Sequence, residues 1–206
     1  MKLLAIDCAA NLCAACVYDA TAKQELGHQV LDLGKGHAEQ LMAVIAEALE
    51  ASATDYAGLG AIAVSVGPGS FTGLRVGVST ARGLALALKI PAIGVTTLEA
   101  LAAEAAAAFP GRAVLAALDA GREEIHAAFY DERLVLTYGP AAATLADVVA
   151  MAKETSPVLA GTAAALISAS ARLAAAKGAG ERPKPLYMRG ADAKPQAGFI
   201  LSRQER

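Results

Sequence analysis

A glycine-rich segment, Gly67-Pro68-Gly69-Ser70-Phe71-Thr72-Gly73, has the residue types of a ligand-binding turn. It joins an apolar run at residues 61–66 to a helical pattern that extends to about residue 89. Glycine permits close approach to the backbone, and free amides at a helix N-terminus attract anions. The pattern therefore fits a phosphate-facing turn, and it fits a plain tight turn with a Ser or Thr helix cap equally well. The residues of this turn are Gly67, Gly69, Ser70, Thr72 and Gly73, with Asp7 as the associated carboxylate.

Known phosphate-binding fingerprints are not matched, because no lysine follows the last glycine of the turn. Asp7 and Asp119 each end an apolar run, where ligands often sit in α/β proteins. Either carboxylate could hold a metal-bound water beside a nucleotide, or accept a hydrogen bond from a backbone turn. The sequence leaves both interpretations open.

Other catalytic patterns are sparse. No two of His28, His37 and His126 are four residues apart, so a helical HxxxH metal site cannot form. Cys13 and Cys16 lie near Cys8, without the fourth cysteine that an iron–sulfur cluster needs. Three residues apart on a strand, Cys13 and Cys16 point to opposite faces, and we interpret all three as reduced core thiols. We therefore predict no catalytic residue and no metal site.

Two predicted helices, at residues 37–50 and 70–89, have unusual surfaces. The first is apolar on two sides, and the second has Gly or Ala every four residues from Gly69 to Ala85. A face with so little side chain lets another helix approach within about 8 Å, either inside the core or at an interface. An exposed apolar patch of this size needs a partner to cover it. The predicted partner surface comprises His37, Leu41, Met42, Ile45, Leu49, Gly73, Gly77, Ala81 and Ala85.

The elements that position these residues occur twice. Tyr18 and Asp19 follow Asp7 by eleven and twelve residues, and Tyr130 and Asp131 follow Asp119 by the same separations. Both halves are predicted to have the order βββαβα, which implies two similar α/β lobes that share a cleft. We place the lobes at residues 1–110, the partner-docking lobe, and 111–206, with a flexible basic tail. In the second lobe we predict a third strand at 133–137, a helix at 162–176 and an edge strand at 186–188.

Composition narrows the function further. The 206 residues are 55% hydrophobic and carry a formal charge of −2, which excludes global disorder and a broad basic footprint for nucleic acid. No apolar run is long enough to span a membrane, and we expect a cytoplasmic protein.

Several of these motifs together resemble the TsaB (YeaZ) family. They are Ala5-Ile6-Asp7, the helix at His37, the run Gly67 to Arg75, Gly83-Leu84-Ala85, Gly94 to Leu98, and Pro185 to Arg189. The resemblance is dense over residues 1–131 and implies the actin-like, Hsp70-like ATPase fold. The stretch between residues 160 and 185 is short against the family pattern, so we expect a shortened second lobe and an altered nucleotide cleft.

The resemblance also implies a function. Members of this family act in forming N6-threonylcarbamoyladenosine at position 37 of tRNAs that read codons beginning with A. They are non-catalytic paralogues of TsaD that dimerise with it as scaffold and activator, with TsaE as an ATPase partner. TsaD carries an HxxxH pair, whereas this chain has Leu41 four residues after His37. The implied picture includes homodimers in the absence of TsaD, indirect tRNA contact, no tightly bound cofactor, and ATP or ADP only at the interface with TsaD.

The alternative is a stand-alone enzyme on the same fold. It would be a small ATP-dependent phosphotransferase or a relict metallopeptidase. Tight binding of Mg-ATP or zinc by the isolated protein would favour it, whereas the missing HxxxH pair and P-loop favour the scaffold.

Overall fold

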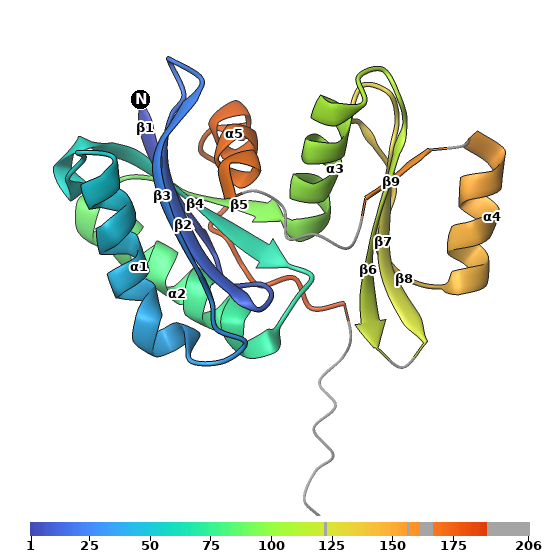
Figure 1. Cartoon of the computed structure of the whole chain (residues 1–206), viewed down its shortest axis with the longest axis horizontal. Coiled ribbons are helices and arrows are strands. Elements are labelled where there is room, and N and C mark those ends of the chain that lie inside the picture. The colour runs from blue at the N-terminus through green and yellow to red at the C-terminus, as the bar shows by residue number, and fades with distance from the viewer. Residues whose placement is uncertain (122, 156, 161–166, 189–206) are drawn as a thin grey trace, which may run out of the picture.

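The computed structural model describes residues 1–121, 123–155, 157–160 and 167–188 and places them around two β-sheets (Figure 1). The first sheet has the strand order β3-β2-β1-β4-β5. β1, β2 and β3 are antiparallel neighbours, whereas β4 and β5 run parallel to β1. Parallel neighbours need crossover connections, which α1 and α2 supply. The bounds are β1 Lys2–Asp7, β2 Leu12–Asp19, β3 Gln24–Asp32, α1 His37–Ala51, β4 Leu59–Gly67, α2 Phe71–Leu88 and β5 Ala92–Thr96, with a 3₁₀ turn at Tyr56–Gly58.

The second sheet repeats this plan with the order β8-β7-β6-β9. β6, β7 and β8 are antiparallel neighbours, and β9 runs parallel to β6 after the helix α4. The tandem βββαβα arrangement is therefore confirmed, and the second sheet is the smaller of the two described. The bounds are α3 Thr97–Ala108, β6 Val114–Gly121, β7 Glu124–Tyr130, β8 Leu136–Thr144, α4 Leu145–Thr155, β9 Val158–Ala160 and α5 Ile167–Lys177.

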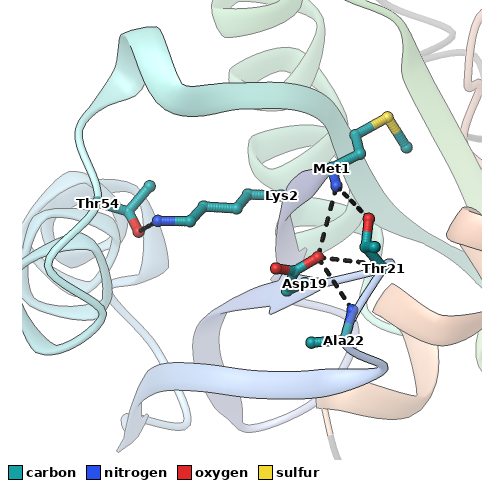
Figure 2. A network of polar contacts seen from close by, with 6 residues as sticks. All are labelled: Met1, Lys2, Asp19, Thr21, Ala22 and Thr54. Carbon is teal, nitrogen blue, oxygen red and sulfur yellow. Dashed lines mark hydrogen bonds and ion pairs between the residues drawn. The ribbon is translucent and has the colours of Figure 1, made fainter.

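The repeated spacing of acids reflects repeated turns. Asp19 ends β2 and accepts a hydrogen bond from the Thr21 amide at 2.8 Å, and Asp131 does the same from the Arg133 amide at 2.9 Å. Short acidic side chains favour such bonds to the backbone two residues on. The Asp19 carboxylate also accepts from the amino group of Met1 at 3.4 Å, and that amino group donates to the Thr21 hydroxyl at 2.8 Å (Figure 2). The backbone amides hold the pKa of Asp19 below its usual value.

The helices form layers on the two sheets (Figure 1). α1 and α2 cover one face of the first sheet, and α5 covers the opposite face. α3 lies beside α5 and packs on the second sheet, while α4 lies on that sheet's other face. α5 thus comes from the second half of the chain but packs on the first sheet. The sequence boundary near residue 110 separates the sheets without separating every helix.

Alanine decides how closely α5 approaches the first sheet. The interface is built mainly from Ala5, Ala14, Ala61, Ala63, Ala169, Ala171 and Ala174, all buried. Because alanine fills little volume, the backbones of α5 and the sheet can lie close together. The opposite face is filled by larger side chains such as Leu4, Ile6 and Ile45. Burying each of these contributes about 1.5–3 kcal/mol.

α3 begins at a capping box formed by Thr96 and Glu99. The Thr96 hydroxyl accepts from the Glu99 amide at 3.1 Å, and the Glu99 carboxylate accepts from the Thr96 amide at 2.9 Å. Both donors would otherwise be unsatisfied at the helix start. Glu99 also pairs with Lys177 of α5 at 2.8 Å, a partly exposed ion pair that ties the two helices together.

Two predicted strands differ from the structure. The third strand of the second lobe begins at Leu136, because Asp131 accepts from the amides of Arg133 and Val135 and holds that segment in a turn. No strand forms at residues 186–188, where the Leu186 amide donates to the Val66 carbonyl at 2.6 Å. The first residues of the predicted helix at 162–176 and the tail from residue 189 lie outside the described residues. Within the described part of the chain, no helix is long and apolar enough to cross a membrane.

Candidate functional site

The glycine-rich turn is held tightly against the segment that follows β1. The Ser70 amide donates to the Ala9 carbonyl at 2.7 Å, and the Ser70 hydroxyl accepts from the Gly73 amide at 3.3 Å. A Cβ at Gly69 would lie 2.2 Å from the Ala9 carbonyl oxygen, and one at Gly73 would lie 1.9 Å from that of Cys8. Both glycines therefore serve backbone packing, and Ser70 caps α2 as the tight-turn interpretation predicts. Thr72 is exposed and makes no cap.

Asp7 and Asp119 occupy equivalent turns but different environments. Each accepts a hydrogen bond at 2.7 Å from the amide two residues on, Ala9 and Gly121 respectively. Asp119 is exposed, whereas Asp7 is half-buried, and burial raises the pKa of Asp7. The Ala9 amide, the Ser65 hydroxyl and the nearby His37 offset part of that effect. Both carboxylates therefore have the structural role that the backbone-turn interpretation gives them.

A pocket of about 490 Å³ lies between the two lobes. The first lobe contributes Pro68, Gly69, Ser70 and Thr97, and the second contributes Asp119 and His126. The Thr97 hydroxyl is buried with no hydrogen-bond partner among the described residues. Gly67, Thr72, Gly73 and Asp7 lie outside this lining.

The lining of the interlobe pocket bears on nucleotide binding. Among the described residues, no Lys or Arg lines it, and its one acidic residue is Asp119. A di- or triphosphate brings several negative charges that need cationic or metal partners. The described lining residues therefore do not fit a nucleotide polyphosphate on their own.

The small-residue face of α2 packs inside this chain. Gly73, Gly77, Ala81 and Ala85 are all buried, and Gly77 faces Cys8 and Val64 of the first sheet region. On α1, His37, Leu41, Ile45 and Leu49 are buried against the same sheet. A partner that docks on these helices would contact other residues, so the predicted surface is wrong in these eight side chains. The small residues at every fourth position of α2 do indicate close packing, but the element that packs against them is the β-sheet. Met42 is the one member of the predicted set that is exposed.

The outer side of α2 instead carries a cluster that the sequence analysis missed. The Arg75 guanidinium lies 3.8 Å from the centre of the Phe71 ring and donates from Nε to the Tyr187 hydroxyl at 2.9 Å. The Phe71 and Tyr187 rings are 5.2 Å apart. Phe71 and Arg75 stand within the quoted motif, but nothing in the sequence indicates that Tyr187, 112 residues from Arg75, joins them. We call Phe71, Arg75 and Tyr187 the aromatic–arginine cluster.

The cysteines are core residues. Cys8 and Cys13 pack on the α1–α2 side of the first sheet, whereas Cys16 packs on the α5 side, as the strand periodicity predicts. Burial raises the pKa of all three thiols, which keeps them protonated and unreactive. The His37 side chain also has a structural role, since its Nε2 lies 3.0 Å from the Ala10 carbonyl oxygen.

Comparison with known proteins gives consistent matches. Residues 31–189 match the model of the TsaD family, described as tRNA N6-adenosine threonylcarbamoyltransferase. The tRNA threonylcarbamoyladenosine biosynthesis protein TsaB of Escherichia coli is 37% identical over 131 residues, which cover 63% of this chain and 55% of that protein. An uncharacterized protein of Mycobacterium tuberculosis is 35% identical over 206 residues, which cover 95% of each chain. The chain thus spans about half the length of the E. coli relative and nearly all of the mycobacterial one.

Solved structures agree with the fold. The structure titled YeaZ from Pseudomonas aeruginosa has a TM-score of 0.70 at 24% identity and covers 90% of this chain and 99% of that one. A second P. aeruginosa structure, titled as similar to peptidase YeaZ, has a TM-score of 0.74 at 24% identity, with 91% and 99% covered. The two-lobed α/β architecture predicted from the repeat is confirmed and is shared with the YeaZ structures, in agreement with the actin-like fold that the family resemblance implies.

Proposed function

Because the chain belongs to the TsaB/YeaZ family, we propose that it is a subunit of the cytoplasmic complex that forms N6-threonylcarbamoyladenosine at position 37 of tRNA. Its substrates are the tRNAs that read codons beginning with A. The chain acts there as a non-catalytic scaffold and activator that forms a heterodimer with TsaD, and TsaE is a further partner. The proposal extends the name of the E. coli relative and the TsaD family match to this chain.

The observation that carries the docking proposal is the outer surface of α1 and α2. Phe71, Leu86, Met42 and Tyr187 are all exposed large apolar side chains there. Arg75 is held against two aromatic rings, and aromatic and arginine side chains dominate the binding energy of protein interfaces. The cluster is also preorganised, which lowers the entropy lost when a partner binds.

The role of His37 supports the absence of catalysis. A zinc site on one helix face needs two ligands four residues apart, and the second position here is the buried Leu41. The His37 ring bonds the Ala10 carbonyl and lies beneath the helix. We infer that α1 has kept the first histidine of such a pair for packing.

A homodimer in the absence of TsaD is supported by charge. α1 carries Glu39, Glu47 and Glu50 and no basic side chain, whereas α2 carries Arg75 and Arg82 and no acidic one. A two-fold axis between two copies can set α1 of one copy against α2 of the other, so that opposite charges meet. ATP or ADP at the TsaD interface remains a prediction, since none of the described residues that line the interlobe pocket is basic.

Two matched phenylalanines test the docking surface. Phe71 is 53% exposed in the aromatic–arginine cluster, and Phe109 is 51% exposed beyond the end of α3. Phe71→Ala should weaken binding to TsaD by roughly 30-fold, the effect of losing an interface hot spot of about 2 kcal/mol. Phe109→Ala should leave the affinity unchanged. Calorimetric titration of each variant with TsaD decides, and equal effects of the two changes would refute the assignment.

The enzyme alternative is tested on the isolated chain. Calorimetry with Mg-ATP and with zinc should show no micromolar binding. Micromolar binding of either ligand, with turnover, would establish a phosphotransferase or a metallopeptidase in place of the scaffold.

A further inference from the structure

The C-terminal part of α2, next to the start of β5, carries a second pocket of about 480 Å³. Its charged lining residues are all basic: Arg82 and Lys89 from α2 and its C-cap, and Arg182 from the segment that crosses beside them. None of the three forms an ion pair with a described residue. We call this the α2 basic pocket.

Acidic residues are scarce in the segments that build this face. No Asp or Glu occurs between Asp55 and Glu99, although the whole chain has 20 acidic and 18 basic residues. The crossing segment at residues 180–188 contains Glu181, which is not among the lining residues, together with Arg182 and Lys184. Uncompensated like charges repel each other, so grouping them opposes folding unless an anion joins them. The pattern therefore indicates an external anionic ligand.

The helix end accounts for only one of these charges. A cation near a helix C-terminus interacts favourably with the helix dipole, and Lys89 stands at the C-cap of α2. Arg82 lies nearly two turns earlier, and Arg182 comes from a distant segment, so neither gains from that dipole. Their shared pocket needs another explanation.

The floor of the pocket is shaped for close approach. It includes Gly83, Ala85 and Gly180, which leave the backbone uncovered. A Cβ at Gly83 would have no atom within 4 Å, so the exposed side of α2 is open there. Two guanidinium groups at the rim supply planar pairs of donors that match phosphate oxygens.

We propose that the α2 basic pocket binds the phosphate backbone of tRNA. This inference rests on the proposed function, because tRNA is the polyanion on which the complex acts. It replaces the expectation of purely indirect tRNA contact with a direct one. The pocket lies at the C-terminal end of α2, whereas the aromatic–arginine cluster lies at its N-terminal end.

The test compares two triple charge reversals with the same change in net charge. The first variant reverses the three positive charges of the pocket: Arg82→Glu, Lys89→Glu and Arg182→Glu. The second reverses three exposed residues elsewhere: Lys23→Glu, Arg133→Glu and Lys153→Glu. The probe is a transcribed, fluorescently labelled tRNA with adenosine 37 and an anticodon that reads codons beginning with A. Anisotropy is measured with the full chain alone and with its complex with TsaD.

The expected result follows from counterion release. Three phosphate contacts give a slope of log K against log salt of about −2 to −3, or roughly a 15- to 60-fold loss between 50 and 200 mM salt. The pocket variant should lose at least about tenfold in tRNA affinity at 50 mM salt and show a flatter slope. The control variant should retain the wild-type tRNA affinity and the wild-type salt slope.

Three outcomes would overturn the proposal. Equal losses in both variants would show that net charge alone attracts the RNA. Loss of TsaD binding with unchanged tRNA affinity in the pocket variant would assign the pocket to a protein. Inorganic tripolyphosphate that binds as tightly as tRNA would assign it to a small phosphate ligand. Failure of the wild-type chain to bind TsaD would instead refute the proposed function, and the tRNA comparison on the chain alone would still stand.

Discussion

Three glycines of α2 form a graded series that tests how the helix packs. Placing a Cβ at Gly73 would put it 1.9 Å from the Cys8 carbonyl oxygen, a backbone atom that cannot rotate away. At Gly77 the nearest atoms would lie at 3.6 Å, an ordinary contact, and at Gly83 none lies within 4 Å. Replacing glycine with alanine on this helix therefore produces a collision at Gly73, an ordinary contact at Gly77 and no contact at Gly83.

The magnitudes follow from these distances. Gly73→Ala requires a backbone shift of about 1.5 Å, and overpacking a well-filled core costs about 1–3 kcal/mol or more. Gly83→Ala removes glycine from an exposed helix interior and should stabilise the protein by about 0.5–1 kcal/mol. Gly77→Ala combines that gain with a tolerated contact and should lie between the two. For a chain of this size, 1 kcal/mol corresponds to roughly 2–4 °C in Tm.

The assay is urea and thermal unfolding followed by far-ultraviolet circular dichroism, supported by tyrosine fluorescence because the chain has no tryptophan. We expect Tm to fall by about 4–8 °C for Gly73→Ala, for a loss near 2 kcal/mol, and to rise by about 1–4 °C for Gly83→Ala. Similar shifts in both variants would refute the reasoning, since they would show that α2 does not pack its glycine face on the segment after β1. A Gly73→Ala variant that fails to fold would agree with the collision, and Gly77→Ala would then supply the measurable comparison.

Three further substitutions test the candidate site. Asp7→Asn keeps an acceptor for the Ala9 amide and removes a carboxylate whose pKa is raised by burial. The wild type therefore loses stability as pH rises above about 3.9, the unfolded value, so the variant should be the more stable at pH 7 and lose its advantage towards pH 4; a difference that does not vary with pH contradicts this. His37→Ala removes the bond to the Ala10 carbonyl and should destabilise the fold by about 1–3 kcal/mol in urea unfolding, without changing zinc binding. Thr96→Ala removes the cap of α3 and should cost about 1 kcal/mol by the same measurement; no loss would show that the capping box is unimportant.

Much of the fold could be predicted because its signals are local. The apolar runs, the capping box at Thr96 and the paired acids at Asp19 and Asp131 each depend on residues a few positions apart. The third strand of the second lobe was displaced for a local reason too, since Asp131 organises a turn where the apolar pattern alone indicates a strand. Turn chemistry therefore outweighed hydrophobic periodicity at that point.

The sequence by itself determined that α1 and α2 carry small or apolar faces, that the chain repeats an α/β unit, and that residues between Asp55 and Glu99 are free of acid. Only the tertiary structure decided what each face meets. The small-residue face of α2 contacts the sheet of its own lobe, and α5 packs on the first sheet. Tyr187 lies beside Phe71 and Arg75. The physical reason is that a periodic pattern fixes which side of a helix is buried, whereas the partner of that side is fixed by packing between segments far apart in the chain.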